Sequence, residues 1–223
     1  MAAAVALATA LAVAAPARAD DEGDLPARQK ILLLLRVLAY DRNLKTRAGE
    51  SAGVAILHRA GNERSEACRR ELSASLEEVA ASSVVSGLAI QPRSLAWAGP
   101  AALDAALAPG RTSALFVCPG LEDWVPAIRA AARRRSTFTA SAGRTGAEGG
   151  LSLGLVKRDG HAVLVVNLEA SRAEGVDLDS TLLRIAEVIR EAAPAVKAAP
   201  EPKLEPSNLP EPTAPGSPPA EWP

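Results

Sequence analysis

Short apolar runs alternate with longer amphipathic segments through most of the chain. Runs of roughly 4–8 apolar residues predict strands buried on both faces, whereas apolar residues spaced three or four positions apart predict helices. Because each helical crossover returns the chain to the same end of the sheet, this alternation predicts a parallel sheet covered by helices on both faces. The predicted strands are GVAILH (53–58), SGLAIQP (86–92), SALFVC (113–118) and STFTAS (136–141), and the predicted helices are 26–42, 62–81, 100–108 and 121–135.

The alternation changes after residue 142. Two apolar runs in LSLGLVKRDGHAVLVVNL flank Asp159-Gly160, which is a strong signal for a tight type I′ hairpin. A last amphipathic segment predicts a helix over residues 180–192, with Leu182, Ile185, Ala186 and Ile189 facing inward. The sequence therefore predicts an α/β three-layer sandwich, with a mostly parallel sheet, a C-terminal antiparallel β-hairpin and a final helix.

The two ends of the chain differ in composition from the middle. Residues 1–19 are small and apolar and end in Ala17-Arg18-Ala19, the pattern that precedes signal-peptidase cleavage. Residues 193–223 hold ten of the 17 prolines and few large aliphatic side chains, so we expect a disordered tail there. This leaves residues 20–192 for a single exported α/β domain, and we expect a periplasmic location.

Charge limits the class of partner. Lys and Arg number 25 against 26 Asp and Glu, which gives a net charge of -1. A nucleic-acid-binding protein would need a clear basic excess, so we expect no nucleic-acid partner. The run Arg133–Arg135 is better explained as the end of a helix, where cations complement the helix dipole.

The two cysteines, Cys68 and Cys118, acquire meaning from the predicted export. In an oxidising compartment they can form a disulfide, and two buried thiols are the alternative. The predicted positions, early in a helix and at the end of a strand in the adjacent layer, allow either. Metal binding by these cysteines with His58 and His161 lacks a recognisable ligand spacing, so we expect no metal and no cofactor.

The stretch from residue 165 to 190 contains the most polar cluster of the domain. Ser171 and Glu174 have the spacing of a helix capping box, with Gly175 placed to end that turn in the left-handed region. Asp177 and Asp179 precede the final helix, where acids cap free N–H groups. With no nucleophile or histidine nearby in sequence, these acids are predicted to be structural and not catalytic.

Two further features bear on ligand binding. Asn167 ends an apolar strand, so we expect it to satisfy neighbouring backbone groups, with a role in lining a pocket as the alternative. The loop that begins Arg144-Thr145-Gly146 follows a predicted strand and is a candidate ligand loop. It leads towards a hairpin strand and lacks a following helix N-terminus, which favours a flexible connection over a phosphate site.

The same C-terminal stretch resembles the signature of the YfiR-like (YfiR/HmsC) periplasmic proteins. That signature has a strand ending in Asn-Leu, an alanine-rich turn with a glycine, and Ser-x-Leu-Leu-x-x-Ala on the last helix. The resemblance extends over residues 28–190, although the first helix lacks the aromatic residues and the Trp-Pro of the family. The matching residues are Asn167, Leu168, Ala170, Ala173, Gly175, Ser180, Leu182, Leu183 and Ala186.

The resemblance implies a non-enzymatic regulator that represses a membrane diguanylate cyclase by contacting its periplasmic domain, often as a homodimer. A sensor kinase is the other membrane partner considered. The helices at 26–42 and 180–192 are the expected contact surfaces, with Arg36 and Arg42 exposed on the first. The alternative function is a periplasmic small-ligand-binding module that serves a sensor or transporter. An enzyme is the weakest reading, because the chain has two histidines and no G-x-S-x-G or CxxC motif.

Overall fold

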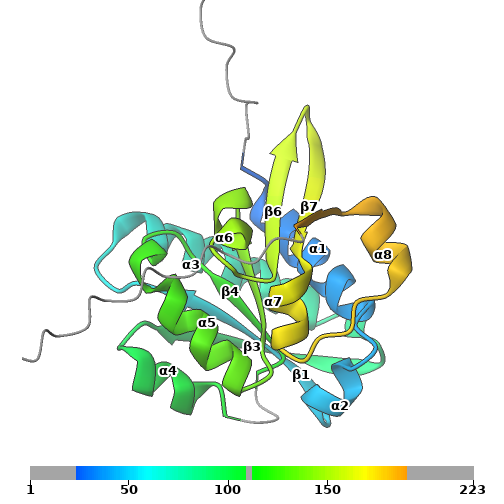
Figure 1. Ribbon diagram of the computed structural model, residues 1–223. Coiled ribbons are helices and arrows are strands. Elements are labelled where there is room, and N and C mark those ends of the chain that lie inside the picture. The colour runs from blue at the N-terminus through cyan, green and yellow to red at the C-terminus, as the bar shows by residue number, and fades with distance from the viewer. Residues whose placement is uncertain (1–23, 109–111, 190–223) are drawn as a thin grey trace, which may run out of the picture. The chain divides into compact units, whose positions relative to one another are not determined.

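The computed structural model describes residues 24–108 and 112–189, which form one α/β unit around an eight-stranded sheet (Figure 1). The strand order is β2-β3-β1-β4-β5-β6-β7-β8. Strands β3, β1, β4, β5 and β6 are parallel neighbours, and β7 runs antiparallel to β6. The short β2 and β8 lie at the two edges of the sheet. The strands are β1 (Ser51–His58), β2 (Val84–Val85), β3 (Leu88–Ala96), β4 (Ala114–Val117), β5 (Phe138–Ala142), β6 (Leu153–Arg158), β7 (His161–Asn167) and β8 (Glu187–Ile189).

Helices cover both faces of the sheet, as the alternating pattern predicted. The core on one face combines α1 and α3 with the sheet, and the core on the other face combines α4 and α5 with it. The three-layer sandwich and its mostly parallel sheet are therefore confirmed. The helices are α1 (Ala27–Ala39), α2 (Leu44–Ala48), α3 (Glu63–Ala80), α4 (Pro100–Ala106), α5 (Val125–Arg134), α6 (Arg144–Glu148), α7 (Leu168–Ala173) and α8 (Ser180–Ile185), and a 3₁₀ turn η1 (Glu122–Trp124) precedes α5.

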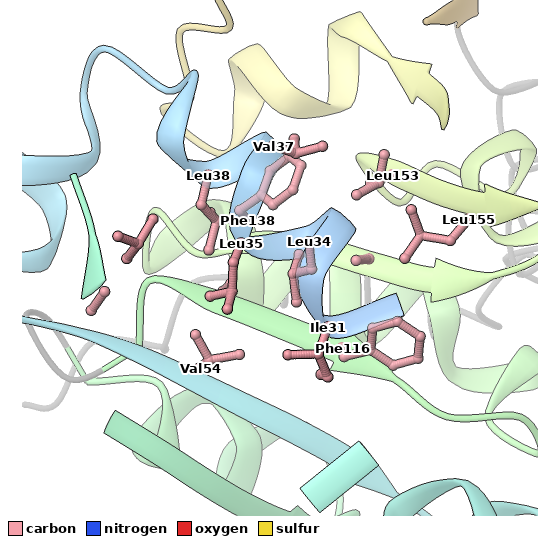
Figure 2. Packing of buried hydrophobic residues seen from close by; sticks show 14 of the residues in the cluster. Ile31, Leu34, Leu35, Val37, Leu38, Val54, Phe116, Phe138, Leu153 and Leu155 are labelled. Atoms are coloured by element: carbon pink, nitrogen blue, oxygen red, sulfur yellow. The ribbon is translucent and has the colours of Figure 1, made fainter. Parts of the chain in front are cut away.

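The central strands are buried on both faces because successive side chains point to opposite layers. In β1, Val54 and Ile56 pack towards α1 and α3, whereas Ala55 and Leu57 pack towards α4 and α5. Figure 2 shows the larger core, in which the rings of Phe116 and Phe138 lie with the leucines of α1. Leu34, Leu38 and the two rings are inaccessible to solvent, so this face of the first helix is held firmly on the sheet. The labelled side chains are Ile31, Leu34, Leu35, Val37, Leu38, Val54, Phe116, Phe138, Leu153 and Leu155.

The predicted hairpin joins β6 and β7 and extends beyond the rest of the sheet in Figure 1. At its turn Asp159 has φ 51° and Gly160 has φ 79°. Two consecutive residues with positive φ define the type I′ turn that the Asp-Gly pair predicted. The turn fixes the register in which Arg158 faces His161.

The final helix is shorter than the amphipathic pattern predicted. Helix α8 ends at Ile185, Ala186 is extended, and the chain continues as β8. Ile185, which was expected to face inward, is 73% exposed, and Ile189 lies in the strand. The reason is that the free edge of β7 offers backbone partners: β8 pairs with Val165, Val166 and Asn167. Those hydrogen bonds outweigh the helical preference of the segment.

One further expectation on local structure is corrected, and two others concern residues outside the described part of the chain. The connection expected after residue 143 is instead the short helix α6, which follows Gly143 at φ 83°. The signal peptide predicted for residues 1–19 and the tail predicted for 193–223 lie outside the described residues. Within residues 24–108 and 112–189, no helix combines the length and apolar character needed to cross a lipid bilayer.

Candidate functional site

A crevice opens where the chain changes direction across the sheet. Strands β1 and β4 are neighbours, but the chain leaves β1 through α3 on one face and leaves β4 through α5 on the other. The first turns of these two helices therefore diverge at the carboxyl ends of the strands. In open α/β sheets, such a switch point is where ligands bind.

A cavity of about 830 Å³ lies at this edge of the sheet. Its volume falls within the range of roughly 300–1,000 Å³ that is typical of small-molecule sites. Its walls come from the start of α1, the first half of α3, the ends of β4 and β5, and α6. Apolar side chains supply much of its surface, and these are Leu72, Val117, Leu121, Val125, Leu151 and Val156.

The polar side chains of the cavity differ in how well they are already paired. Lys30 is buried and forms an ion pair with Asp24 at 2.7 Å. Glu122 accepts a hydrogen bond from the backbone N–H of Gly120 at 2.9 Å. The hydroxyl of Ser141 is buried without a hydrogen-bond partner in the described part of the chain. Arg64 lies on the exposed surface beside the cavity. The cavity can therefore accept an apolar molecule that carries a few polar groups.

Both cysteines line this cavity. Cys68 comes from α3 and is half-buried, whereas Cys118 follows β4 and is 1% exposed. Neither thiol forms a disulfide in the structure, and the two are close enough to shift each other's pKa. The contact with Cys118 lowers the pKa of the Cys68 thiol, and the same contact together with burial raises the pKa of Cys118. The sequence left open a disulfide or two thiols, and the disulfide stays a prediction.

Only part of the candidate ligand loop lines the cavity. Thr145 and Gly146 line the cavity, together with Ala142, Gly143 and Gly149. Arg144 is absent from the cavity wall; it forms an ion pair with Glu187 of β8 and so joins α6 to the edge strand. Two of the three residues of the candidate ligand loop therefore line the cavity, and ligand binding by the loop stays a prediction.

Asn167 caps a helix that the sequence did not predict. Its side-chain oxygen accepts from Ala170 N at 2.9 Å, and its amide donates to the carbonyl of Ala147 at 3.0 Å. It is buried, and its role is to satisfy the backbone, which is the role we favoured. The predicted capping box is wrong: Ser171 donates to the Asn167 carbonyl inside α7, and Glu174 follows the end of that helix.

Glu174 is buried between three elements. Its carboxylate accepts hydrogen bonds from the backbone N–H and the hydroxyl of Thr139 on β5, and from the hydroxyl of Ser152 before β6. Burial raises the pKa of Glu174 to about 7, although these hydrogen bonds act in the opposite direction. Sequence reasoning missed this group because an acid beside a glycine gives no signal of burial.

The remaining signature residues position the C-terminal segment and do not line the cavity. Gly175 ends α7 with φ 75°, as predicted, and Leu182 is buried in the larger core. Leu183 and Ala186 pack against that core, Leu168 begins α7, and Ser180 begins α8. Asp179 caps α8 by accepting from Thr181 N at 2.7 Å, which confirms that acid as a cap.

A second cluster lies at the carboxyl edge and was missed from the sequence. The rings of Trp97 and Trp124 lie 5.9 Å apart, and the guanidinium of Arg59 stands 4.8 Å from the Trp124 ring centre. The scarcity of aromatic residues, 3% of the chain, was the signal that could have drawn attention to the tryptophans. In the described ranges, no three His, Cys, Asp or Glu side chains gather as a metal-binding group.

Comparison with solved structures supports the fold. A conserved domain protein from Vibrio cholerae matches with a TM-score of 0.55 and 14% identity over 74% of this chain and 60% of its own. The ABC domain from Streptococcus pneumoniae, solved in complex with L-Trp, matches with a TM-score of 0.52 and 12% identity over 74% of this chain and 62% of its own. This chain thus matches less than two thirds of each neighbour, and at such identities the likeness concerns the fold alone.

Comparison at the level of sequence identifies the family. No curated protein matches the chain significantly. The sequence model of the YfiR/HmsC-like family matches residues 42–187, a region that runs from the end of the first helical segment to the start of β8. It includes both cysteines, the cavity loops and the whole C-terminal signature. The chain therefore belongs to the YfiR/HmsC-like family.

Proposed function

We propose that this protein is a non-enzymatic periplasmic regulator that represses a membrane diguanylate cyclase. The observation that carries the proposal is the family match over residues 42–187. Members of the family regulate membrane signalling proteins from the periplasm. The partner would be the periplasmic segment of the cyclase, with a sensor kinase as the second candidate.

The surface proposed for this contact combines the exposed faces of α1 and α8. Leu32 is 45% exposed on α1 with Arg36 one turn further along, and Ile185 is 73% exposed on α8. The end of α1 lies beside the start of α8, because the N–H of Asp179 donates to the carbonyl of Tyr40 at 2.9 Å. Apolar side chains beside a cation are common at the centre of protein interfaces.

Arg42 is a poorer probe of this surface than the sequence indicated. Its guanidinium pairs with Asp179 at 2.7 Å and with Asp177 at 3.8 Å, so its replacement would disturb the cap of α8. Arg36 is exposed and lies outside these contacts. The charge reversal Arg36→Glu therefore separates loss of a partner from loss of the fold.

Capture of partners from native membranes tests the proposal. We expect the wild-type domain to recover a cyclase or sensor kinase, and Arg36→Glu to recover it on the order of tenfold less well. Arg133→Glu, at the end of α5 on the opposite layer, is the matched control and should bind as wild type. Recovery of no membrane signalling protein by the wild-type domain would contradict the proposal.

A second candidate function is favoured by the cavity. A periplasmic module that binds a small ligand would use a concave site at the carboxyl edge, and a cavity of about 830 Å³ lies there. The structural neighbour solved with L-Trp makes an amino acid a sensible first member of a ligand panel. A specific ligand should raise the melting temperature through preferential binding to the folded state. If none of a broad panel of periplasmic metabolites changes it, this candidate fails.

A further inference from the structure

The thiol pair stands at a place that small molecules can reach. Cys68 and Cys118 come from α3 and from the end of β4, and both line the cavity of about 830 Å³. The two thiols are close enough to shift each other's pKa, so they are neighbours in the cavity wall. A thiol pair buried in a closed core would lack such access. Here the reactive groups are part of the cavity wall.

The two thiols have unequal surroundings. Cys68 is half-buried in the second turn of α3, whereas Cys118 is 1% exposed. The neighbouring thiol and Lys30 lower the pKa of Cys68, and contact with Cys68 together with burial raises the pKa of Cys118. Because Cys68 is the more exposed thiol on the cavity wall, an incoming disulfide reagent meets Cys68 first.

We propose that Cys68 is an S-thiolation site, at which low-molecular-weight disulfides entering the cavity react and then oxidise the Cys68–Cys118 pair. This inference does not depend on the cyclase partner. It states that thiol–disulfide exchange takes place in the cavity and that Cys68 reacts before Cys118. The sequence offered no reason to distinguish the two cysteines.

The reaction balances in two exchanges. The Cys68 thiol gives its proton to solvent, and the thiolate attacks one sulfur of the reagent RS–SR. The reagent S–S bond breaks as the Cys68–SR bond forms, and RS⁻ leaves and takes a proton. The thiolate of Cys118 then attacks the Cys68 sulfur and releases the second RS⁻. The protein loses two electrons and two protons, and the reagent becomes two molecules of RSH.

Trapping the first intermediate tests the order of attack. The reduced domain is treated with glutathione disulfide, and the adducts are located by mass spectrometry of peptides. In Cys118→Ser the mixed disulfide at Cys68 should accumulate, because the second thiol is missing. In Cys68→Ser, Cys118 should react on the order of tenfold more slowly or less. Wild type should end as the internal disulfide. Equal rates for the two single variants, or no adduct on Cys68, would overturn the proposal.

Substitutions that fill the cavity test whether the reagent reaches Cys68 through it. Ala67 lies on the cavity side of α3 next to Cys68, and Ala67→Trp should slow the reaction of Cys68 with glutathione disulfide on the order of tenfold. Ala74→Trp, on the exposed side of the same helix, is the matched control and should react at the wild-type rate. Thr145→Trp fills the cavity from α6, which protects the test if the first variant fails to fold.

The outcomes separate cleanly once circular dichroism shows that the variants are folded. Slowing by either cavity-filling variant without slowing by Ala74→Trp supports entry through the cavity. Wild-type rates in every folded cavity-filling variant would show that the reagent reaches Cys68 by another path and would overturn the proposal. Neither result depends on recovery of a membrane partner, so this inference and the proposed regulator function can fail separately.

Discussion

Glu174 is the residue whose environment departs most from its sequence context. Its carboxyl is fully buried, its donors are Thr139 and Ser152, and its pKa lies at about 7, against an ordinary value near 4.5. Between these two values the folded chain keeps the proton that the unfolded chain has released. The free energy of unfolding therefore falls as pH rises through this window, by on the order of 3 kcal/mol for the full shift.

The substitution Glu174→Gln should remove this dependence, because an amide does not titrate, while its oxygen can still accept from the N–H of Thr139. Urea unfolding at about pH 5 and about pH 8 measures it. We expect wild type to lose more stability than Glu174→Gln between the two conditions. Parallel stability profiles for the two proteins would show that Glu174 titrates in the folded state as it does in the unfolded chain.

The helix α7 depends on Asn167 through two buried hydrogen bonds, one to its own first turn and one to the carbonyl of Ala147 near α6. Asn167→Ala removes both and leaves the Ala147 carbonyl without this donor. We expect a loss of about 2–3 kcal/mol in the free energy of unfolding, measured in urea.

The matched control is Asn62→Ala, which removes the less buried cap of α3 and its bond to Ser65 N at 3.0 Å. It should cost about 1 kcal/mol. A loss for Asn167→Ala no larger than that of the control would mean that the bond to Ala147 contributes nothing measurable.

The elements with strong local signals were predicted from the sequence. Strand β1 contains the apolar run at residues 54–57, Asn62 caps α3, and the Asp159-Gly160 turn adopts the expected positive φ at both residues. The errors lie where tertiary contacts decide. The segment after Ile185 joins the edge of β7 as a strand, and Glu174 is held by Thr139 and Ser152, which are 35 and 22 residues away along the chain. No local pattern records such partners.

In the candidate site, too, local features were predicted from the sequence, whereas features that depend on tertiary contacts were not. The loop that begins Arg144-Thr145-Gly146 was a candidate ligand loop in the sequence, because loops after parallel strands gather at one edge of the sheet, although a flexible connection was favoured. The cavity itself requires α1, α3 and α6 to meet there, and the pattern of one segment carries no information on that meeting. The approach of Cys68 to Cys118 was expected from adjacent layers, but the inequality of the two thiols depends on their mutual contact and their different burial in the fold.

At the scale of the whole molecule, α1 takes part in two surfaces. Its first turn, with Lys30, lines the cavity at the carboxyl edge of the central strands, whereas Leu32 and Arg36 on its exposed side belong to the proposed partner surface and do not line the cavity. Oxidation of the thiol pair should therefore leave the exposed face of α1 chemically unchanged, and chemical labelling of that face before and after oxidation would check this.

The most direct test of the regulator function is the amount of cyclic di-GMP in the native host. We expect deletion of the gene to raise cyclic di-GMP, because repression of the cyclase is lost. Wild type and Arg133→Glu, supplied in trans, should restore the original level, and Arg36→Glu should restore it poorly although the protein is exported and folded. An unchanged level in the deletion strain would contradict the account, and full restoration by Arg36→Glu would remove α1 as the contact surface.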